Sequence, residues 1–208
     1  MPQLGIVRHG QSVWNKENKF TGWVDVSLSE KGMEEARQAG RLLAGSYHFD
    51  VAFTSALERA QKTLELILET TGQTDIPVIR DQALNERMYG DLQGANKDDM
   101  RARYGDEQVR QWRRSFDMAP PNGESLKDTY ERVMPYYHQH IAPELNKGKH
   151  VLIAAHGNSL RALIMHLESM GPEDILKVEI PTGQPKIYDM DDALRVEKAY
   201  FLDPSLAE

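Results

Sequence analysis

The chain contains no cysteine, so neither disulfide bonds nor thiol chemistry can take part in its structure or activity. It also lacks a long apolar run, since no stretch approaches the roughly 20 residues of a membrane-spanning helix. The opening residues Met1-Pro2-Gln3-Leu4 show no basic region followed by a long apolar segment, which predicts no signal peptide. We therefore expect a cytoplasmic protein without membrane contact.

Positive charge is also scarce. The 208 residues include 25 Lys and Arg against 32 Asp and Glu, a formal net charge of −7. That balance argues against binding to nucleic acid, which is itself a polyanion. If the substrate is a small anion, its pocket must concentrate arginine and lysine locally against the field of the whole protein. The length fits one domain that can bury a core.

One construction occurs twice in the chain. The apolar run 4–7 precedes Arg8 and His9, the apolar run 151–155 precedes His156, and a glycine follows each histidine. Each run predicts a buried strand with histidine at its C-terminal end and a helix beyond it. Open α/β sheets bind ligands at the carboxyl ends of their strands, so we expect the two imidazoles to share a site.

Strands alternate with helices along the rest of the chain. This pattern predicts an α/β fold, a three-layer sandwich with a mainly parallel central sheet flanked by helices. Residues 81–124 are polar and rich in charge, Gly and Pro, with helical stretches near 97–104 and 107–115, and they predict a helical cap inserted into a single domain of residues 1–208. Further strands are expected at 50–54, 77–79, 186–190 and 196–202, and helices after Ser29, at 56–70, from Ser125 with a break near Pro135 or Pro143, and at 159–169.

Seven blocks spread over nearly the whole chain carry a resemblance to a known family: residues 8–15 with 20–23, 55–60, 84–90, 93–97, 112–115, 123–126 and 155–161. In this order they resemble the histidine phosphatase superfamily and, more narrowly, its cofactor-dependent phosphoglycerate mutase branch. A lone Arg-His-Gly would be weak evidence, whereas seven ordered blocks are strong. Residues 119–123 join two blocks that longer family members separate, so the chain resembles a short-form mutase.

The resemblance implies interconversion of 3-phosphoglycerate and 2-phosphoglycerate through a phosphohistidine, primed by the cofactor 2,3-bisphosphoglycerate, in glycolysis and gluconeogenesis. His9 would be the nucleophile, while the guanidinium groups of Arg8 and Arg59 would neutralise the phosphoryl oxygens. His156 would donate to the transferring group, and Glu86 would act as general acid and base.

A larger set is expected to bind the phosphates and carboxylate of the substrate, for which the planar fork of arginine is well suited. It comprises Arg8, Ser12, Asn15, Thr21, Gly22, Arg59, Glu86, Arg87, Tyr89, Lys97, Arg113, Arg114, Gly157 and Asn158. The alternative for the 110–114 arginines is a solvated helix face. We expect no metal, because the other histidines lack the spacing of a ligand set with nearby acidic residues: His48, His138, His140, His150 and His166.

Two other functions stay open. A broad-specificity phosphatase of the same superfamily would hydrolyse phosphohistidine with water, whereas Lys97, Arg113 and Arg114 would retain a bisphosphorylated intermediate and favour a mutase. A non-catalytic module for phosphorylated ligands would be expected to lack His9, Glu86 or His156, and all three are present. The sequence leaves open whether the chain forms a homodimer, and whether residues 203–208 are an idle tail or a lid that keeps water from phosphohistidine.

Overall fold

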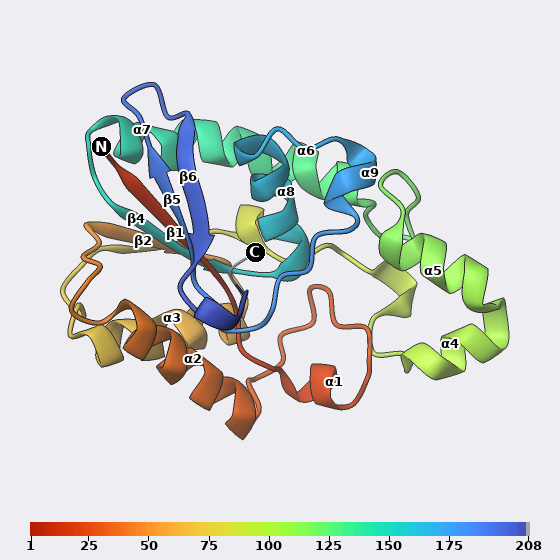
Figure 1. Cartoon of the computed structure of the whole chain (residues 1–208). Helices are drawn as coiled ribbons and strands as arrows, with labels where there is room; N and C mark the ends of the chain where they lie inside the picture. The colour runs from red at the N-terminus through yellow and green to blue at the C-terminus, as the bar shows by residue number, and fades with distance from the viewer. Residues whose placement is uncertain (207–208) are drawn as a thin grey trace.

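The computed structural model describes residues 1–206 and is organised around a six-stranded sheet in the order β3-β2-β4-β1-β5-β6 (Figure 1). The strands are β1 (Gln3–Arg8), β2 (Val51–Thr54), β3 (Val78–Arg80), β4 (Val151–Ala155), β5 (Lys186–Met190) and β6 (Val196–Phe201). The first four pair in parallel, and β5 and β6 extend the sheet in antiparallel fashion beside β1. The predicted α/β fold with a mainly parallel sheet is confirmed.

Helices cover both faces of this sheet. On one face lie α2 (Glu30–Leu43) and α3 (Glu58–Thr71), and on the other lie α6 (Leu126–Tyr136), α7 (Ala142–Asn146) and α8 (Gly157–Leu167) (Figure 1). Successive residues of a strand point to opposite faces, so each central strand contributes to two cores. In β4, Ile153 packs with the α6–α8 layer while its neighbour Leu152 packs with the α2–α3 layer.

The segment 81–124 leaves the sheet after β3. It contains η1 (Gln82–Leu84), η2 (Gly90–Leu92), α4 (Lys97–Tyr104) and α5 (Asp106–Arg114), and the last two lie to one side of the sandwich (Figure 1). A separate apolar cluster that includes Phe20, Val109 and Trp112 packs this segment against the loop that follows α1 (Val13–Lys16). The helices expected near 97–104 and 107–115 are thus observed, while the division into one domain with a cap at 81–124 stays a prediction.

The break expected in the helix after Ser125 is wrong. Pro135 lies inside α6, the next residues form the π-helical turn η3 (Tyr137–Ile141), and α7 follows without an intervening loop. Proline lacks an N–H group, and a π turn changes the hydrogen-bond spacing without ending the helix. The helix predicted at 159–169 begins earlier, at Gly157, so that its first backbone amides directly follow His156.

The chain ends, as far as it is described, with α9 (Pro172–Ile175), the β5–β6 hairpin and η4 (Pro204–Leu206). Because β6 is antiparallel to β5 and β5 to β1, β6 ends at the same edge of the sheet as β1. The expected lid or idle tail at residues 203–208 lies partly outside the described residues, at positions 207–208. Its role stays a prediction.

The turn after β1 passes very close to the start of α2. A Cβ atom on Gly10 would lie 2.1 Å from the carbonyl oxygen of Gly32, and a Cβ atom on Gly32 would lie 2.0 Å from the carbonyl oxygen of Gln11. The Ser29 side chain accepts a hydrogen bond from the Gly32 amide at 3.1 Å and so caps α2 as predicted. Both glycines are required because the two backbones touch.

We expect Gly32→Ala to destabilise the protein by roughly 1–3 kcal/mol, because the added methyl group has to displace backbone atoms. In a free helix the same change would gain up to about 1 kcal/mol. Urea denaturation followed by circular dichroism measures the difference. Gly171→Ala is the control, since a Cβ there meets no atom within 4 Å. An unchanged or higher midpoint for Gly32→Ala would contradict the close approach.

Candidate active site

A pocket of about 190 Å³ lies at the carboxyl edge of the sheet. The neighbouring parallel strands β1 and β4 end in register, with Arg8 opposite Ala155, so His9 and His156 follow them side by side. Their ring centroids are 4.9 Å apart and both side chains are buried. The expected meeting of the two imidazoles is therefore observed, while their roles stay predictions at this point.

The environment of His9 fixes both its tautomer and its charge. Its Nδ1 atom lies 2.6 Å from the carbonyl oxygen of Gly10, which can only accept, so Nδ1 carries the hydrogen and Nε2 carries the lone pair. Burial, reinforced by the positive charges of Arg59 and Arg8, holds the pKa of His9 well below its usual range. His9 is thus a neutral imidazole at neutral pH, with the lone pair of Nε2 available.

His156 carries its hydrogen on the same ring nitrogen as His9, but a different nitrogen has the protein partner. Its Nε2 atom lies 2.7 Å from Oγ of Ser55, and that oxygen already accepts the Leu57 amide at 3.1 Å. The Ser55 hydroxyl is then free to donate to Nε2, which leaves the hydrogen on Nδ1. Burial, then the charge of Arg59, holds the pKa of His156 well below its usual range. The buried Nδ1 has no hydrogen-bond partner in the described part of the chain, so its N–H group is available to a ligand oxygen.

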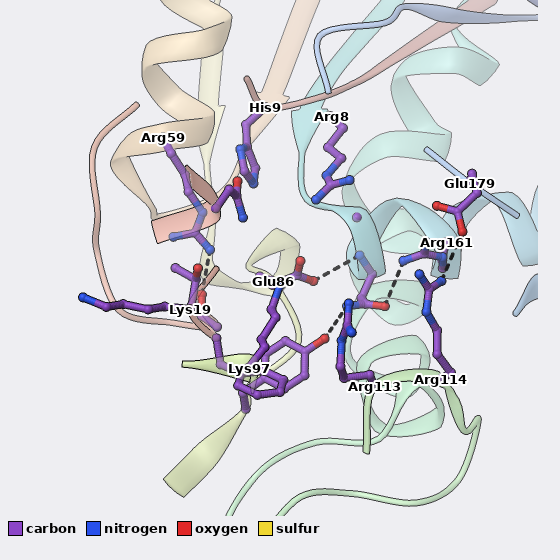
Figure 2. Close-up of a pocket in the computed structure, with 17 residues that line it drawn as sticks. Arg8, His9, Lys19, Arg59, Glu86, Lys97, Arg113, Arg114, Arg161 and Glu179 are labelled. Carbon is purple, nitrogen blue, oxygen red and sulfur yellow. Dashed lines mark hydrogen bonds and ion pairs between the residues drawn. The ribbon is translucent and has the colours of Figure 1, made fainter. Parts of the chain in front are cut away.

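The guanidinium groups of Arg8 and Arg59 lie on either side of His9, as Figure 2 shows. Arg59 donates to the carbonyl oxygens of Gly22 at 2.7 Å and Val24 at 3.0 Å, and Arg8 donates to that of Ile180 at 2.9 Å. Burial lowers the pKa of Arg59 to about 10, which still leaves it charged at neutral pH. These carbonyl partners orient the groups without cancelling their charge, so both can bind an anion.

Glu86 faces the histidines from the segment after η1. Its Oε1 atom accepts hydrogen bonds from the Asn158 amide at 3.0 Å and from the Arg87 amide at 2.8 Å. Asn158 belongs to the first turn of α8, where free amides and the helix dipole favour a carboxylate. Glu86 is therefore held in the pocket by backbone groups on two sides.

The outer part of the pocket is strongly cationic. Lys97, Arg113 and Arg114 come from α4 and α5 (Figure 2), and Tyr89 also lines this part, where its hydroxyl oxygen accepts from Nδ2 of Asn158 at 3.4 Å. Burial, followed by the positive charges of Arg113 and Arg8, lowers the pKa of Lys97 to about 8. An anionic ligand would favour the charged form of Lys97, so the pKa of Lys97 would rise when such a ligand binds.

Most of the predicted site residues meet in this pocket. Those that line it are Arg8, His9, Asn15, Thr21, Gly22, Arg59, Glu86, Tyr89, Lys97, Arg113, Arg114, Gly157 and Asn158. His156 does not line it but packs edge-on against His9.

Ser12 and Arg87 do not line this pocket. The Ser12 side chain is buried and caps α1 by accepting the Asn15 amide at 3.0 Å. The Arg87 guanidinium is buried among carbonyl oxygens, those of Glu124 at 2.6 Å, Met118 at 3.2 Å and Trp112. These bonds engage Nε and Nη2 of Arg87, and the residue also lines a small cavity with Arg113, Arg114 and Asn158, so its expected direct contact with the substrate stays a prediction.

The sequence reasoning missed four residues that line the pocket: Lys19, Phe20, Arg161 and Glu179. Arg161 could have been found, because it lies one helical turn after Asn158 and therefore on the same face of α8. Glu179 belongs to a segment without any recognised motif, and no signal in the sequence points to it.

No other histidine lines the pocket, and within residues 1–206 no group of three or more His, Asp or Glu side chains could hold a metal ion. In the same residues, no helix has the length and apolar character that crossing a membrane requires.

The fold and the two histidines at the sheet edge define the class of protein. Residues 4–200 match the histidine phosphatase superfamily (branch 1), and the chain belongs to that superfamily. Among its curated relatives, it is 59% identical to the phosphoglycerate mutase of Schizosaccharomyces pombe over 90% of each chain. It is 61% identical to the 2,3-bisphosphoglycerate-dependent phosphoglycerate mutase of Bradyrhizobium sp. (strain BTAi1), over 89% of this chain and 90% of the relative.

Solved structures agree with this assignment. The Bacillus stearothermophilus protein YhfR superposes with a TM-score of 0.83 at 25% identity over 95% of both chains. A mycobacterial glucosyl-3-phosphoglycerate phosphatase in complex with VO3 gives a TM-score of 0.81 at 26% identity over 97% of both chains. The resemblance to the histidine phosphatase superfamily and to its phosphoglycerate mutases is confirmed.

The lowered pKa of Lys97 predicts that anion binding weakens as the pH rises through about 8, because Lys97 then loses its charge. Sulfate keeps its charge over this range, so its dissociation constant, measured by calorimetry, reports on the protein alone. We expect roughly tenfold weaker binding at about pH 9.5 than at about pH 7. Lys97→Arg should remove most of this dependence, since arginine stays protonated. If sulfate binding depends equally on pH in the unmodified protein and in Lys97→Arg, Lys97 is not the group responsible.

Proposed function

We propose that the chain catalyses the interconversion of 3-phosphoglycerate and 2-phosphoglycerate through phosphohistidine, as a 2,3-bisphosphoglycerate-dependent phosphoglycerate mutase of glycolysis and gluconeogenesis. One observation carries the proposal: a neutral, buried His9 opens into a pocket whose cations exceed what one phosphoryl group requires. The Arg8 and Arg59 pair suits the phosphoryl group at His9, and Lys97 with Arg113 forms a second cationic set farther out. The names of the relatives described above support the same function.

The donors of the pocket fit a ligand with two phosphates and a carboxylate. Arg8 Nε, Thr21 Oγ1 and His156 Nδ1 are buried without a partner among the described residues, so bound ligand oxygens would satisfy them. We propose that Arg8, Arg59 and His156 hold the phosphate at His9, and that Lys97, Arg113 and Arg114 hold the second anionic end. When bound, 2,3-bisphosphoglycerate supplies the phosphoryl group that primes His9.

In the proposed mechanism, Nε2 of the phosphorylated His9 is the leaving group. The Glu86 carboxylate takes the proton from the attacking hydroxyl of a monophosphoglycerate, an O–P bond forms, and the Nε2–P bond breaks. Arg8, Arg59 and the His156 N–H stabilise the charge on the phosphoryl oxygens during transfer. In the return transfer Nε2 attacks the other phosphate, and Glu86 gives its proton to the departing oxygen.

A second candidate is a broad-specificity phosphatase of the same superfamily, favoured by the likeness to the mycobacterial phosphatase structure. It would use the same His9, with water in place of the second hydroxyl. The outer set of Lys97, Arg113 and Arg114 favours the mutase. These cations can retain a product with two phosphates while that product reorients in the site. Metal-independent catalysis, a cytoplasmic location and a homodimer stay predictions.

Incubation with labelled 2,3-bisphosphoglycerate should phosphorylate His9, and His9→Ala should lose both the acid-labile label and isomerisation, because the covalent route is removed. Isomerisation should depend on added 2,3-bisphosphoglycerate and persist in EDTA. His140→Ala is the control, since His140 is an exposed histidine outside the pocket. If His9→Ala still carries the label, His9 is not the nucleophile.

Replacing Arg113 and Arg114 together by alanine should lower the ratio of isomerisation to hydrolysis by roughly tenfold or more. Without charge-assisted hydrogen bonds to the second anionic group, the doubly phosphorylated product escapes and water reaches phosphohistidine. A coupled assay for 2-phosphoglycerate and a phosphate-release assay give the two rates. The control removes two exposed arginines of α2, Arg37→Ala with Arg41→Ala. An unchanged ratio in the pocket variant would favour the phosphatase.

A further inference from the structure

Two carboxylates line the cationic pocket, and they are held in different ways. Glu86 is fixed by two backbone amides, as described above. Glu179 follows α9, and its side chain is 73% exposed. Its Oε1 atom lies 3.4 Å from Nη1 of Arg114, at the side of the pocket formed by α5 (Figure 2). The mechanism uses Glu86 and leaves Glu179 without a role.

The segment that carries Glu179 orients three guanidinium groups. The carbonyl oxygen of Val178 accepts from Arg161 at 3.1 and 3.2 Å, and that of Ile180 accepts from Arg8 at 2.9 Å. Between them, the carboxylate of Glu179 faces Arg114. Carbonyl groups leave the positive charge of an arginine available to a ligand, whereas a carboxylate offsets it. In the described part of the chain, Arg114 is the only arginine of the pocket with an acidic partner.

Arg114 and Glu179 also line a second, outer cavity of about 510 Å³, together with Arg110 and Lys177. The ion pair therefore stands where the outer cavity adjoins the catalytic pocket. An anion that moves between the two meets this pair. An exposed ion pair contributes little to stability and is readily exchanged, while a phosphate or carboxylate can bind a guanidinium group through two hydrogen bonds.

We propose that Glu179 is a specificity-determining residue whose carboxylate competes with the second anionic group of the ligand for Arg114. A ligand with two anionic groups displaces Glu179 from Arg114, whereas a ligand with a single phosphate leaves the ion pair in place. Glu179 thereby weakens the hold on phosphoglycerates and speeds their release, without affecting the phosphate subsite at His9. This inference rests on the proposed function.

Calorimetry with two matched ligands tests the proposal. 3-Phosphoglycerate has a phosphate and a carboxylate, and glycerol 3-phosphate has the phosphate alone. We expect Glu179→Gln to bind 3-phosphoglycerate about three- to tenfold more tightly than the unmodified protein, because an exposed carboxylate no longer competes with the ligand for Arg114. Its affinity for glycerol 3-phosphate should stay unchanged. Glu197→Gln removes an exposed carboxylate of β6 outside both cavities and should change neither affinity.

A double-mutant cycle identifies the group through which Glu179 acts. In an Arg114→Ala background, Glu179→Gln should have no effect on the affinity for 3-phosphoglycerate. If Glu179 merely positions Arg114, Glu179→Gln weakens binding in the same direction as Arg114→Ala, and the proposal is wrong. The proposal is also overturned if Glu179→Gln raises the affinity for 3-phosphoglycerate equally with and without Arg114, or raises the affinity for both ligands equally. If the unmodified protein does not bind 3-phosphoglycerate at all, the proposed function itself fails.

Discussion

β1 and β4 pair in parallel with Arg8 opposite Ala155, and the His9 amide extends the ladder by donating to the Ala155 carbonyl oxygen at 2.9 Å. This register brings the residue after each strand to the same edge of the sheet. A shift of one residue would turn every side chain of the shifted strand to the other face and separate the two imidazoles. The register is secured because β4 is buried on both faces, and so the meeting of His9 and His156 depends on the packing of the whole sandwich.

Burial then determines the electrostatics of the pocket. The protein is acidic as a whole, with a net charge of −7, yet Arg8 and Arg59 are oriented by carbonyl oxygens rather than by carboxylates. Desolvation of these cations is a cost that a bound anion offsets. The same burial lowers the pKa of His9, so its imidazole stays neutral beside positive charge. Cationic donors and a neutral imidazole are thus present before the ligand arrives, and the proposed nucleophile needs this preorganisation.

The sequence could predict those parts of the site that lie at the ends of regular elements. His9 and His156 follow apolar runs, and Gly157 with Asn158 opens a helix, so periodicity alone places them at one edge of a parallel sheet. The π turn after Pro135 could not be predicted, because a helix that widens and a helix that breaks share the same proline signal.

Irregular segments contain the parts of the site that the sequence does not place. Arg87 is adjacent to Glu86, but no period fixes the direction of its side chain, and in the folded chain its Nε and Nη2 atoms donate to carbonyl oxygens of the segment 81–124. Glu179 was missed for the same reason, because its position depends on how residues 176–182 pass across the ends of the strands. Family resemblance placed Arg87 with the substrate, and its backbone contacts have no signature in the sequence.

The position of Arg87 gives it an indirect part in the site. Its guanidinium donates to the carbonyl oxygen of Trp112, the residue before Arg113, and also to that of Glu124 at the end of the segment. It therefore joins the last turn of α5 to the beginning and the end of the segment 81–124, and Arg113 and Arg114 are carried on that turn. Because Arg113 directly follows Trp112, these hydrogen bonds restrict the backbone from which the two arginines extend toward the pocket.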